Sequence, residues 1–265
     1  MEISGKKVLL TGATGGLGRA MALELARSGA ALTLSGRDTK TLDGLASELP
    51  GEHTVLAADL GEPGAALDLA SRAGAIDCFV ANAALPSTGR ITELTESQIA
   101  RMLRINLEAP ILISQALLPA MLERRSGKLV MIGSLAGKAA SPRSSIYNAT
   151  KFGIRGFALG LKADLAGTGV GITLVAPGFV RDAGMFADSG VEAPAGMGTT
   201  TPEKVVEAVV LAIQKDRPEI AVAPVIQRTM AHLGLVRPTL SYRIQSGSTG
   251  QSAAENLAAG QADKR

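Results

Sequence analysis

Short apolar runs alternate with longer amphipathic stretches along most of this chain. The apolar runs are typical of β-strands and cover residues 7–10, 31–35, 54–57, 76–81, 128–132, 171–175 and 219–222. Predicted helices lie between them at residues 16–28, 39–48, 64–73, 95–123, 145–166 and 202–215. This alternation predicts an α/β fold in which helices cover both faces of a parallel sheet.

The chain length favours one domain over two. Its 265 residues are 46% hydrophobic and only 3% aromatic, so we expect a single aliphatic core. We predict a catalytic domain over residues 1–245, which includes a glycine-rich substrate loop at 182–201 and a helical extension at 225–245. Residues 246–265 are rich in Ser, Gly, Ala and Gln, and we expect a flexible tail there.

Charge and cysteine content exclude several classes of protein. The formal net charge of +3 is too small for a nucleic-acid-binding surface, which needs a clustered basic stripe. Cys78 is the only cysteine, so an internal disulfide is excluded and a reducing compartment is expected. No basic-then-apolar leader precedes the first strand, and no run approaches about 18 apolar residues. We therefore expect a cytoplasmic protein with no membrane-spanning segment.

A glycine-rich loop follows the first predicted strand and opens the first predicted helix. It reads Thr-Gly-Ala-Thr-Gly-Gly-Leu-Gly over residues 11–18. Glycines permit a tight turn and let the backbone approach a phosphate, and the helix N-terminus offers free N–H groups. Arg19 follows the loop where a P-loop would carry Lys, so a P-loop is excluded. We predict a dinucleotide site formed by Gly12, Thr14, Gly16, Leu17 and Gly18.

The end of the second strand indicates which dinucleotide is bound. An acid at this position holds the ribose of NAD, whereas a basic residue accepts the 2′-phosphate of NADP. Arg37 is the first side chain here that can reach outward, and its guanidinium suits a phosphate. Alternatively, Arg37 pairs with Asp38 or faces solvent, while Asp38 holds a ribose. We expect NADP(H) to be preferred, with NAD(H) as the other possibility.

Tyr147 and Lys151 are four residues apart and so lie on one face of a helix. A free tyrosine has a pKa near 10, which is too high for acid–base chemistry at neutral pH. A neighbouring ammonium and an oxidised nicotinamide ring favour the phenolate and lower that pKa. Ser134 ends another predicted strand, at the sheet edge where sites of α/β proteins lie. The three residues together indicate a catalytic group, although the Tyr–Lys spacing alone is common.

From about residue 5 to residue 224, the chain resembles the short-chain dehydrogenase/reductase family. The matching motifs, in the family's order, are the glycine loop, Asp59-Leu60, Asn82-Ala83-Ala84, Asn106, Ser134, Tyr147 with Lys151, and Pro177-Gly178. The resemblance implies a single Rossmann-type, doubly wound parallel sheet of about seven strands. It also implies an oxidoreductase that acts on a small carbonyl or alcohol substrate.

The resemblance implies a role for each motif. Tyr147 would exchange a proton with the substrate oxygen, Ser134 would hydrogen-bond that oxygen, and Lys151 would hold the nicotinamide ribose. Asn106 would support a water that relays protons to Lys151. On the cofactor side the contacts would come from Asp59, Leu60, Asn82, Ala83, Pro177, Gly178 and Val180. A Thr that the family usually carries near Asp182 is missing, so we expect backbone groups around Phe179 and Val180 to make the contact with the carboxamide instead.

Pro110 gives independent support for the role of Asn106. Proline has no N–H, so Pro110 cannot donate to the carbonyl of Asn106 four residues earlier. That carbonyl is then free to accept from a water, although the same proline also explains a simple kink. An unbroken i→i+4 ladder through Asn106 would contradict this prediction.

Three other functions are weighed against this one. A serine hydrolase is excluded because Ile132 stands where the G-x-S-x-G turn needs glycine, and neither His53 nor His232 has a triad context. A 3-oxoacyl thioester reductase is an alternative enzyme, and a non-catalytic NADP(H) sensor is an alternative of another class. No Cys/His cluster indicates a metal.

Two features bear on partners. Residues 225–245 carry Arg228, Arg237 and Arg243 without an acid, and apolar residues recur there at helical spacing. We expect a helix packed on its own body or on a subunit, with weak peripheral membrane contact as the alternative. A small-residue stripe on the catalytic helix predicts a homodimer or homotetramer; it consists of Gly153, Gly156 and Gly160.

Overall fold

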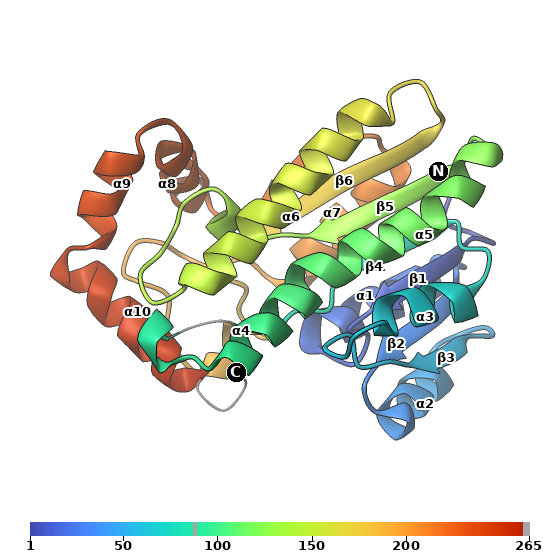
Figure 1. Ribbon diagram of the computed structural model, residues 1–265, viewed down its shortest axis with the longest axis horizontal. Helices are drawn as coiled ribbons and strands as arrows, with labels where there is room; N and C mark the ends of the chain where they lie inside the picture. Colours follow the sequence, from blue (N-terminus) through green and yellow to red (C-terminus); the bar gives the residue numbers. More distant parts are fainter. Residues whose placement is uncertain (87–88, 262–265) are drawn as a thin grey trace.

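Seven parallel strands form one sheet in the order β3-β2-β1-β4-β5-β6-β7, which confirms the predicted fold class. The structure is a computed structural model that describes residues 1–86 and 89–261, with only the backbone described at 248–250 and 253. The strands are β1 (Lys7–Thr11), β2 (Ala31–Gly36), β3 (Thr54–Ala57), β4 (Cys78–Ala81), β5 (Gly127–Ile132), β6 (Val170–Pro177) and β7 (Glu219–Val222). Figure 1 shows the sheet between its helices. The order reverses between β1 and β4, which is where such sheets bind ligands.

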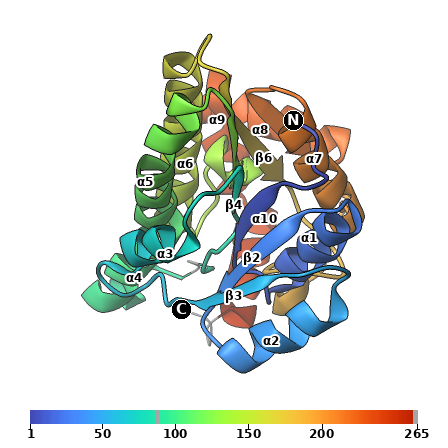
Figure 2. The ribbon, with the colours of Figure 1, turned by 90° about the vertical axis from the view of Figure 1, so that its right-hand side faces the viewer.

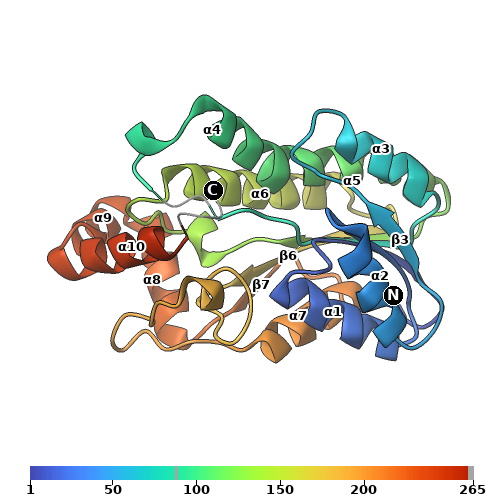
Figure 3. The ribbon, with the colours of Figure 1, turned by 90° about the horizontal axis from the view of Figure 1, so that it is seen from below.

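Helices cover both faces of the sheet, as Figure 2 and Figure 3 show. One layer contains α1 (Gly16–Arg27), α2 (Thr39–Glu48) and α7 (Pro202–Gln214). The other contains α3 (Ala65–Ala73), α4 (Glu96–Leu103), α5 (Ala109–Glu123) and α6 (Ser145–Asp164). Each layer packs on its own cluster of buried aliphatic side chains, around Leu10 and Val209 on one face and around Phe79 and Ile113 on the other. The aliphatic core is thus split by the sheet.

The single helix predicted over residues 95–123 has a π-helical turn in its middle. This turn, η2 (Arg104–Glu108), separates α4 from α5 and ends just before Pro110. By length and composition alone, Glu96–Glu123 is able to cross a membrane. Its apolar residues Ile105, Ile113 and Met121 are instead buried in the core, so packing against the sheet and α3 explains its hydropathy.

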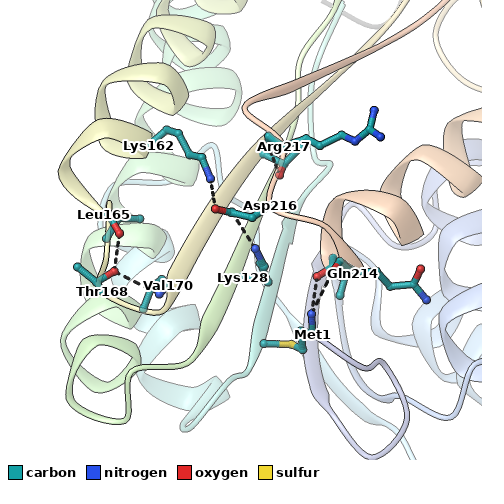
Figure 4. Close-up of polar contacts among 11 residues, drawn as sticks. Met1, Lys128, Lys162, Leu165, Thr168, Val170, Gln214, Asp216 and Arg217 are labelled. Carbon is teal, nitrogen blue, oxygen red and sulfur yellow. Dashed lines mark hydrogen bonds and ion pairs between the residues drawn. The ribbon is translucent and has the colours of Figure 1, made fainter.

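At the amino end of the sheet, Asp216 joins three elements (Figure 4). Its carboxylate accepts from Lys128 Nζ of β5 at 2.9 Å and also pairs with Lys162 of α6. Burial raises the pKa of Asp216, but the hydrogen bonds and charges of the two lysines outweigh it and hold that pKa below its usual value. The α7–β7 turn is therefore fastened to the opposite helix layer.

The structure corrects the flexible tail expected at residues 246–265. The chain beyond β7 forms three helices, α8 (Val225–Val236), α9 (Pro238–Gln245) and α10 (Ser248–Gly260), which lie together beyond one end of the sheet (Figure 1). Ala258 of α10 is buried, and Gln261 donates to the carbonyl of Met185 at 2.9 Å. Residues 262–265 lie outside the described residues. The segment up to residue 261 is therefore packed against the substrate loop.

Candidate functional site

Of the four predicted catalytic residues, Ser134, Tyr147 and Lys151 line one cavity of about 530 Å³ at the carboxyl ends of the strands, and Asn106 does not. Ser134 follows β5, while Tyr147 and Lys151 come from the first turns of α6. Pro177, Gly178 and Val180, which follow β6, line the same cavity, together with Leu17 and Asn82. Loop ends from widely separated parts of the chain thus meet where the strand order reverses.

Close packing explains two glycines of the phosphate loop. Gly12 has a φ of +64°, and a Cβ there would lie 2.8 Å from Cα of Ala83. A Cβ on Gly18 would lie 2.0 Å from the carbonyl oxygen of Gly12, so no larger residue fits. Helix α1 then begins at Gly16 behind Gly15, which has no side chain to cap the first N–H groups. These N–H groups and the helix dipole fit a pyrophosphate.

Thr11 is a functional residue that the sequence reasoning missed. Its hydroxyl accepts from the backbone N–H groups of Asn82 and Ala83, at 3.2 and 3.3 Å. Asn82 Nδ2 in turn donates to the carbonyls of Thr11 and Gly12, at 3.2 and 3.0 Å. These four bonds tie the loop after β4 to the phosphate loop. The position of Thr11 in the glycine motif was the only sequence signal for this role, because threonine is common in strands.

The structure places Arg37 just after β2 with its side chain exposed. Asp38 is the N-cap of α2 and accepts from the backbone N–H of Thr41 at 2.7 Å. One carboxylate oxygen of Asp38 is thus engaged by its own helix, whereas Arg37 is able to reach a phosphate. Nearby, Thr14 Oγ1 lies 3.4 Å from the Cβ position of Gly36, which places Thr14 against the end of β2.

Asp59 pairs with Arg101 of α4, a contact that the sequence reasoning also missed. Arg101 Nη2 donates to both carboxylate oxygens, at 2.7 and 2.8 Å, and the backbone N–H of Gly61 donates at 2.9 Å. Burial raises the pKa of Asp59, but these bonds and the charges of Arg101 and Arg37 hold it below its usual value. Leu60 beside it is buried in the core. These contacts favour the ionised carboxylate of Asp59, and its contact with the cofactor stays a prediction.

Burial moves the pKa values of Tyr147 and Lys151 in opposite directions. It raises the pKa of Tyr147, although a hydrogen bond with Ser134 works the other way. It lowers the pKa of Lys151 to about 8. Lys151 Nζ lies 5.5 Å from the centre of the Tyr147 ring and donates to the carbonyl of Ile132 at 3.0 Å. Ser134 Oγ accepts from the N–H of Ala136 at 3.1 Å, which leaves its proton available to an oxygen in the cavity.

Asn106 lies behind this group, in the π-helical turn η2, and is buried. Its side chain binds the loop after β4: Oδ1 accepts from Leu85 N–H at 2.7 Å, and Nδ2 donates to Leu85 C=O at 2.9 Å. The helix around it is therefore not a regular i→i+4 ladder, and Pro110 supplies no N–H to its carbonyl. The Asn106 side chain thus fixes a loop, and a water bound to its backbone carbonyl stays a prediction.

The segment after β6 is held on both sides. Phe179 accepts from Thr200 N–H at 2.8 Å, and Arg181 donates to Thr200 C=O at 3.0 Å. The side chain of Gln227, from α8, accepts from Phe179 N–H at 3.1 Å. None of these bonds uses the N–H or C=O of Val180, so these two groups fit the carboxamide contact expected near Asp182. Nothing in the sequence indicated this role of Gln227, because its hydrogen-bond partners are backbone atoms.

Comparison with known proteins gives matches over most of the chain. A family profile described as short chain dehydrogenase matches residues 6–192. The ketoacyl reductase HetN of Nostoc sp. (strain PCC 7120) is 34% identical over 254 residues, which cover 91% of this chain and 88% of that protein. The dehydrogenase/reductase SDR family member 7B of Bos taurus is 30% identical, covering 90% of this chain and 80% of that protein.

Solved structures match as well. The 3-oxoacyl (acyl-carrier-protein) reductase of Agrobacterium tumefaciens C58, solved with NADP bound, has a TM-score of 0.75 and 28% identity, covering 83% of this chain and 93% of that one. The short-chain dehydrogenase of Sphingobium yanoikuyae, solved with NADPH, also has a TM-score of 0.75 and 28% identity, covering 89% and 95%. The fold of this chain is thus shared with proteins that have been solved with NADP or NADPH bound.

Proposed function

This chain belongs to the short-chain dehydrogenase/reductase family of oxidoreductases, and we propose that it interconverts a carbonyl and a secondary alcohol on a small apolar substrate with NADP(H). One observation carries the proposal: Ser134, Tyr147 and Lys151 line a single cavity whose other walls are mostly apolar. Such a cavity excludes water from the reacting carbonyl and orients it by a few polar groups.

The protein residues then handle the proton. The bound nicotinamide supplies the hydride in reduction and accepts it in oxidation. Because burial keeps Tyr147 protonated, its hydroxyl is a proton donor to the carbonyl oxygen in reduction. Ser134 hydrogen-bonds the same oxygen with the proton that its contact with Ala136 leaves available. Lys151 would hold the nicotinamide ribose and return a proton to Tyr147, and Asn106 would support a water that relays protons to Lys151.

The preference for NADP(H) rests on Arg37. Its exposed guanidinium follows β2 at the position where a 2′-phosphate is read, while Asp38 is engaged in capping α2. Solved neighbours that carry NADP or NADPH support this choice of cofactor. We expect Arg37→Ala to raise the KM for NADPH at least tenfold and to leave the KM for NADH nearly unchanged. Equal effects on both cofactors would contradict the assignment.

Tyr147→Phe tests the catalytic part of the proposal. The phenylalanine keeps the ring and removes the proton, so kcat for ketone reduction is expected to fall by roughly 10²- to 10⁴-fold. NADPH binding, followed by the fluorescence of the reduced nicotinamide, is expected to stay within about threefold. NADPH binding without turnover of any ketone by the unsubstituted protein, and no effect of Tyr147→Phe, would instead favour a non-catalytic sensor.

A second candidate is the reduction of a 3-oxoacyl thioester. The relatives favour it, since one is a ketoacyl reductase and others are named 3-oxoacyl-[acyl-carrier-protein] reductase. Acetoacetyl-coenzyme A and simple 2-alkanones, compared by kcat/KM with NADPH, distinguish the two. A clear preference for the thioester would make a 3-oxoacyl thioester the proposed substrate in place of the small ketone. Ser134 and Tyr147 would keep the same roles.

A further inference from the structure

The roof of the active-site cavity comes from the C-terminal extension. Met230 of α8, Ile244 of α9, and Ala254 and Leu257 of α10 all line the cavity that Tyr147 lines. The family profile ends at residue 192, before any of them. The extension therefore lies beyond the part of the chain that the family profile matches, and it reaches the site.

Gln227 anchors the extension at one end of the substrate loop. Its side chain is buried and makes three hydrogen bonds to the backbone. It accepts from Phe179 N–H and donates to the carbonyls of Met197 and Gly198, at 3.1 and 2.7 Å. A Cβ on Gly178 would lie 2.0 Å from its Oε1, so glycine is required there to admit the glutamine. One side chain thus joins the two ends of the loop.

The other anchor lies at the far end of the extension. Gln261 Nε2 donates to Met185 C=O at 2.9 Å, and a Cβ on Gly260 would lie 2.2 Å from the carbonyl oxygen of Ser189. Both partners belong to the middle of the substrate loop, beside its short helix η4 (Ala187–Ser189). Glu255 of α10 also pairs with Arg143, from the loop before α6. The helix α10 is thereby fixed over the cavity from two sides.

We propose that residues 225–261 form a subsite for an uncharged aliphatic chain on the substrate, roofed by Met230, Ile244, Ala254 and Leu257. The proposal rests on the proposed carbonyl–alcohol activity. Other residues that line the cavity are apolar as well, including Leu135 and Met185. Among the described residues that line the cavity, the charged ones are Lys151 and Glu192, and Glu192 is exposed. Burial of each methylene contributes about 0.8 kcal/mol, so a longer chain binds more tightly until the subsite is full.

A series of 2-alkanones of increasing chain length tests the subsite. With NADPH, kcat/KM is expected to rise with chain length in the unsubstituted protein. Leu257→Trp fills the space under α10, so the ratio of kcat/KM for 2-decanone over 2-butanone is expected to fall at least tenfold. Leu240→Trp is the matched control, because Leu240 of α9 is 47% exposed and outside the cavity lining. An unchanged ratio in Leu257→Trp would overturn the proposal.

A binding measurement separates failure of the subsite from failure of the proposed activity. N-Phenyl-1-naphthylamine, an uncharged fluorescent probe, is expected to bind the protein and to be displaced by 1-decanol, whether or not any ketone is reduced. Leu257→Trp is expected to weaken probe binding at least fivefold, and Leu240→Trp is not. If no alkanone is reduced but these binding results hold, only the proposed activity fails. If both variants bind alike, the subsite is refuted.

Gln227 is a positioning residue, and a pair of variants tests it. Gln227→Leu removes all three bonds, whereas Gln227→Glu keeps an acceptor for Phe179 N–H and places a carboxylate against the carbonyls of Met197 and Gly198. Hydrogen exchange at the Phe179 amide is expected to accelerate at least tenfold in Gln227→Leu and to stay slow in Gln227→Glu. The KM for 2-decanone is expected to rise in both variants. Equal exchange in the two, or an unchanged KM, would contradict this role.

Discussion

At the scale of single residues, burial sets the charge of the catalytic pair. It raises the pKa of Tyr147 and lowers that of Lys151 to about 8, so it favours the neutral form of both groups. The carbonyl of Ile132 accepts from Lys151 but carries no full charge to offset the loss of water. The ammonium is therefore easy to deprotonate before a cofactor arrives.

This effect predicts a pH dependence of stability. The pKa of Lys151 rises from about 8 in the folded chain to its ordinary value near 10.5 on unfolding, so between these values the unfolded state binds more protons. The free energy of unfolding should then increase with pH across that window, by at most about 3 kcal/mol. Urea unfolding of the cofactor-free protein and of Lys151→Met, from pH 7 to 10, measures the difference. Parallel curves would contradict the prediction.

At the scale of elements, the side chain of Asp216 links the α7–β7 turn to Lys162 in the opposite helix layer. Asp216→Asn removes the charge opposite buried Lys128, and we expect a loss of about 1 kcal/mol at neutral pH, since half-exposed ion pairs contribute little. Because the folded pKa of Asp216 is lowered, the difference should vanish as the pH falls through that pKa. Urea unfolding at pH 7 and in acid checks this, with the exposed Asp43→Asn as control. A pH-independent difference would refute the electrostatic explanation.

The elements also show how far the sequence predicts the structure. Parallel strands have a strong apolar signal: the bounds of the edge strands β3 and β7 are as predicted, and those of the five strands between them differ by one or two residues at an end. The fold class and family are likewise confirmed. The helix α10 is different, because its Ser, Gly and Ala give no periodic pattern, and contacts such as Gln261 with Met185 hold it in place. Contacts between distant backbone atoms, such as those of Gln227, leave no trace in local sequence.

At the scale of the whole molecule, the small-residue stripe of α6 is only partly covered. A Cβ on Gly153 would lie 3.0 Å from the side chain of Leu107, so this glycine packs within the chain. Among the described residues, nothing lies within 4 Å of a Cβ built on Gly156 or Gly160. Phe152 on the same helix is 40% exposed. These features support the proposal that α6 contacts a second copy of the chain.

Gly156→Leu tests that contact. The leucine meets open space within one chain and improves helix propensity, so the fold is expected to be at least as stable. In an oligomer the side chain would separate the two helices, and the mass measured by light scattering should shift toward the monomer. Gly44→Leu in α2 also meets open space and serves as control. Unsubstituted protein that is already monomeric, or an unchanged mass in Gly156→Leu, would refute the interface.

The roof formed by α10 has a further consequence for the time course of turnover. Gln261 and Glu255 fasten α10 over part of the cavity, so we expect product release to require movement of this helix. We then expect release to be slower than hydride transfer, since lid opening is often rate-limiting. Deuterium at the transferred position of NADPH should change kcat by less than about 1.5-fold, while added sucrose should lower kcat with solvent viscosity. In Glu255→Gln, which loosens the roof, the isotope effect on kcat should increase, because bond breaking then limits the rate.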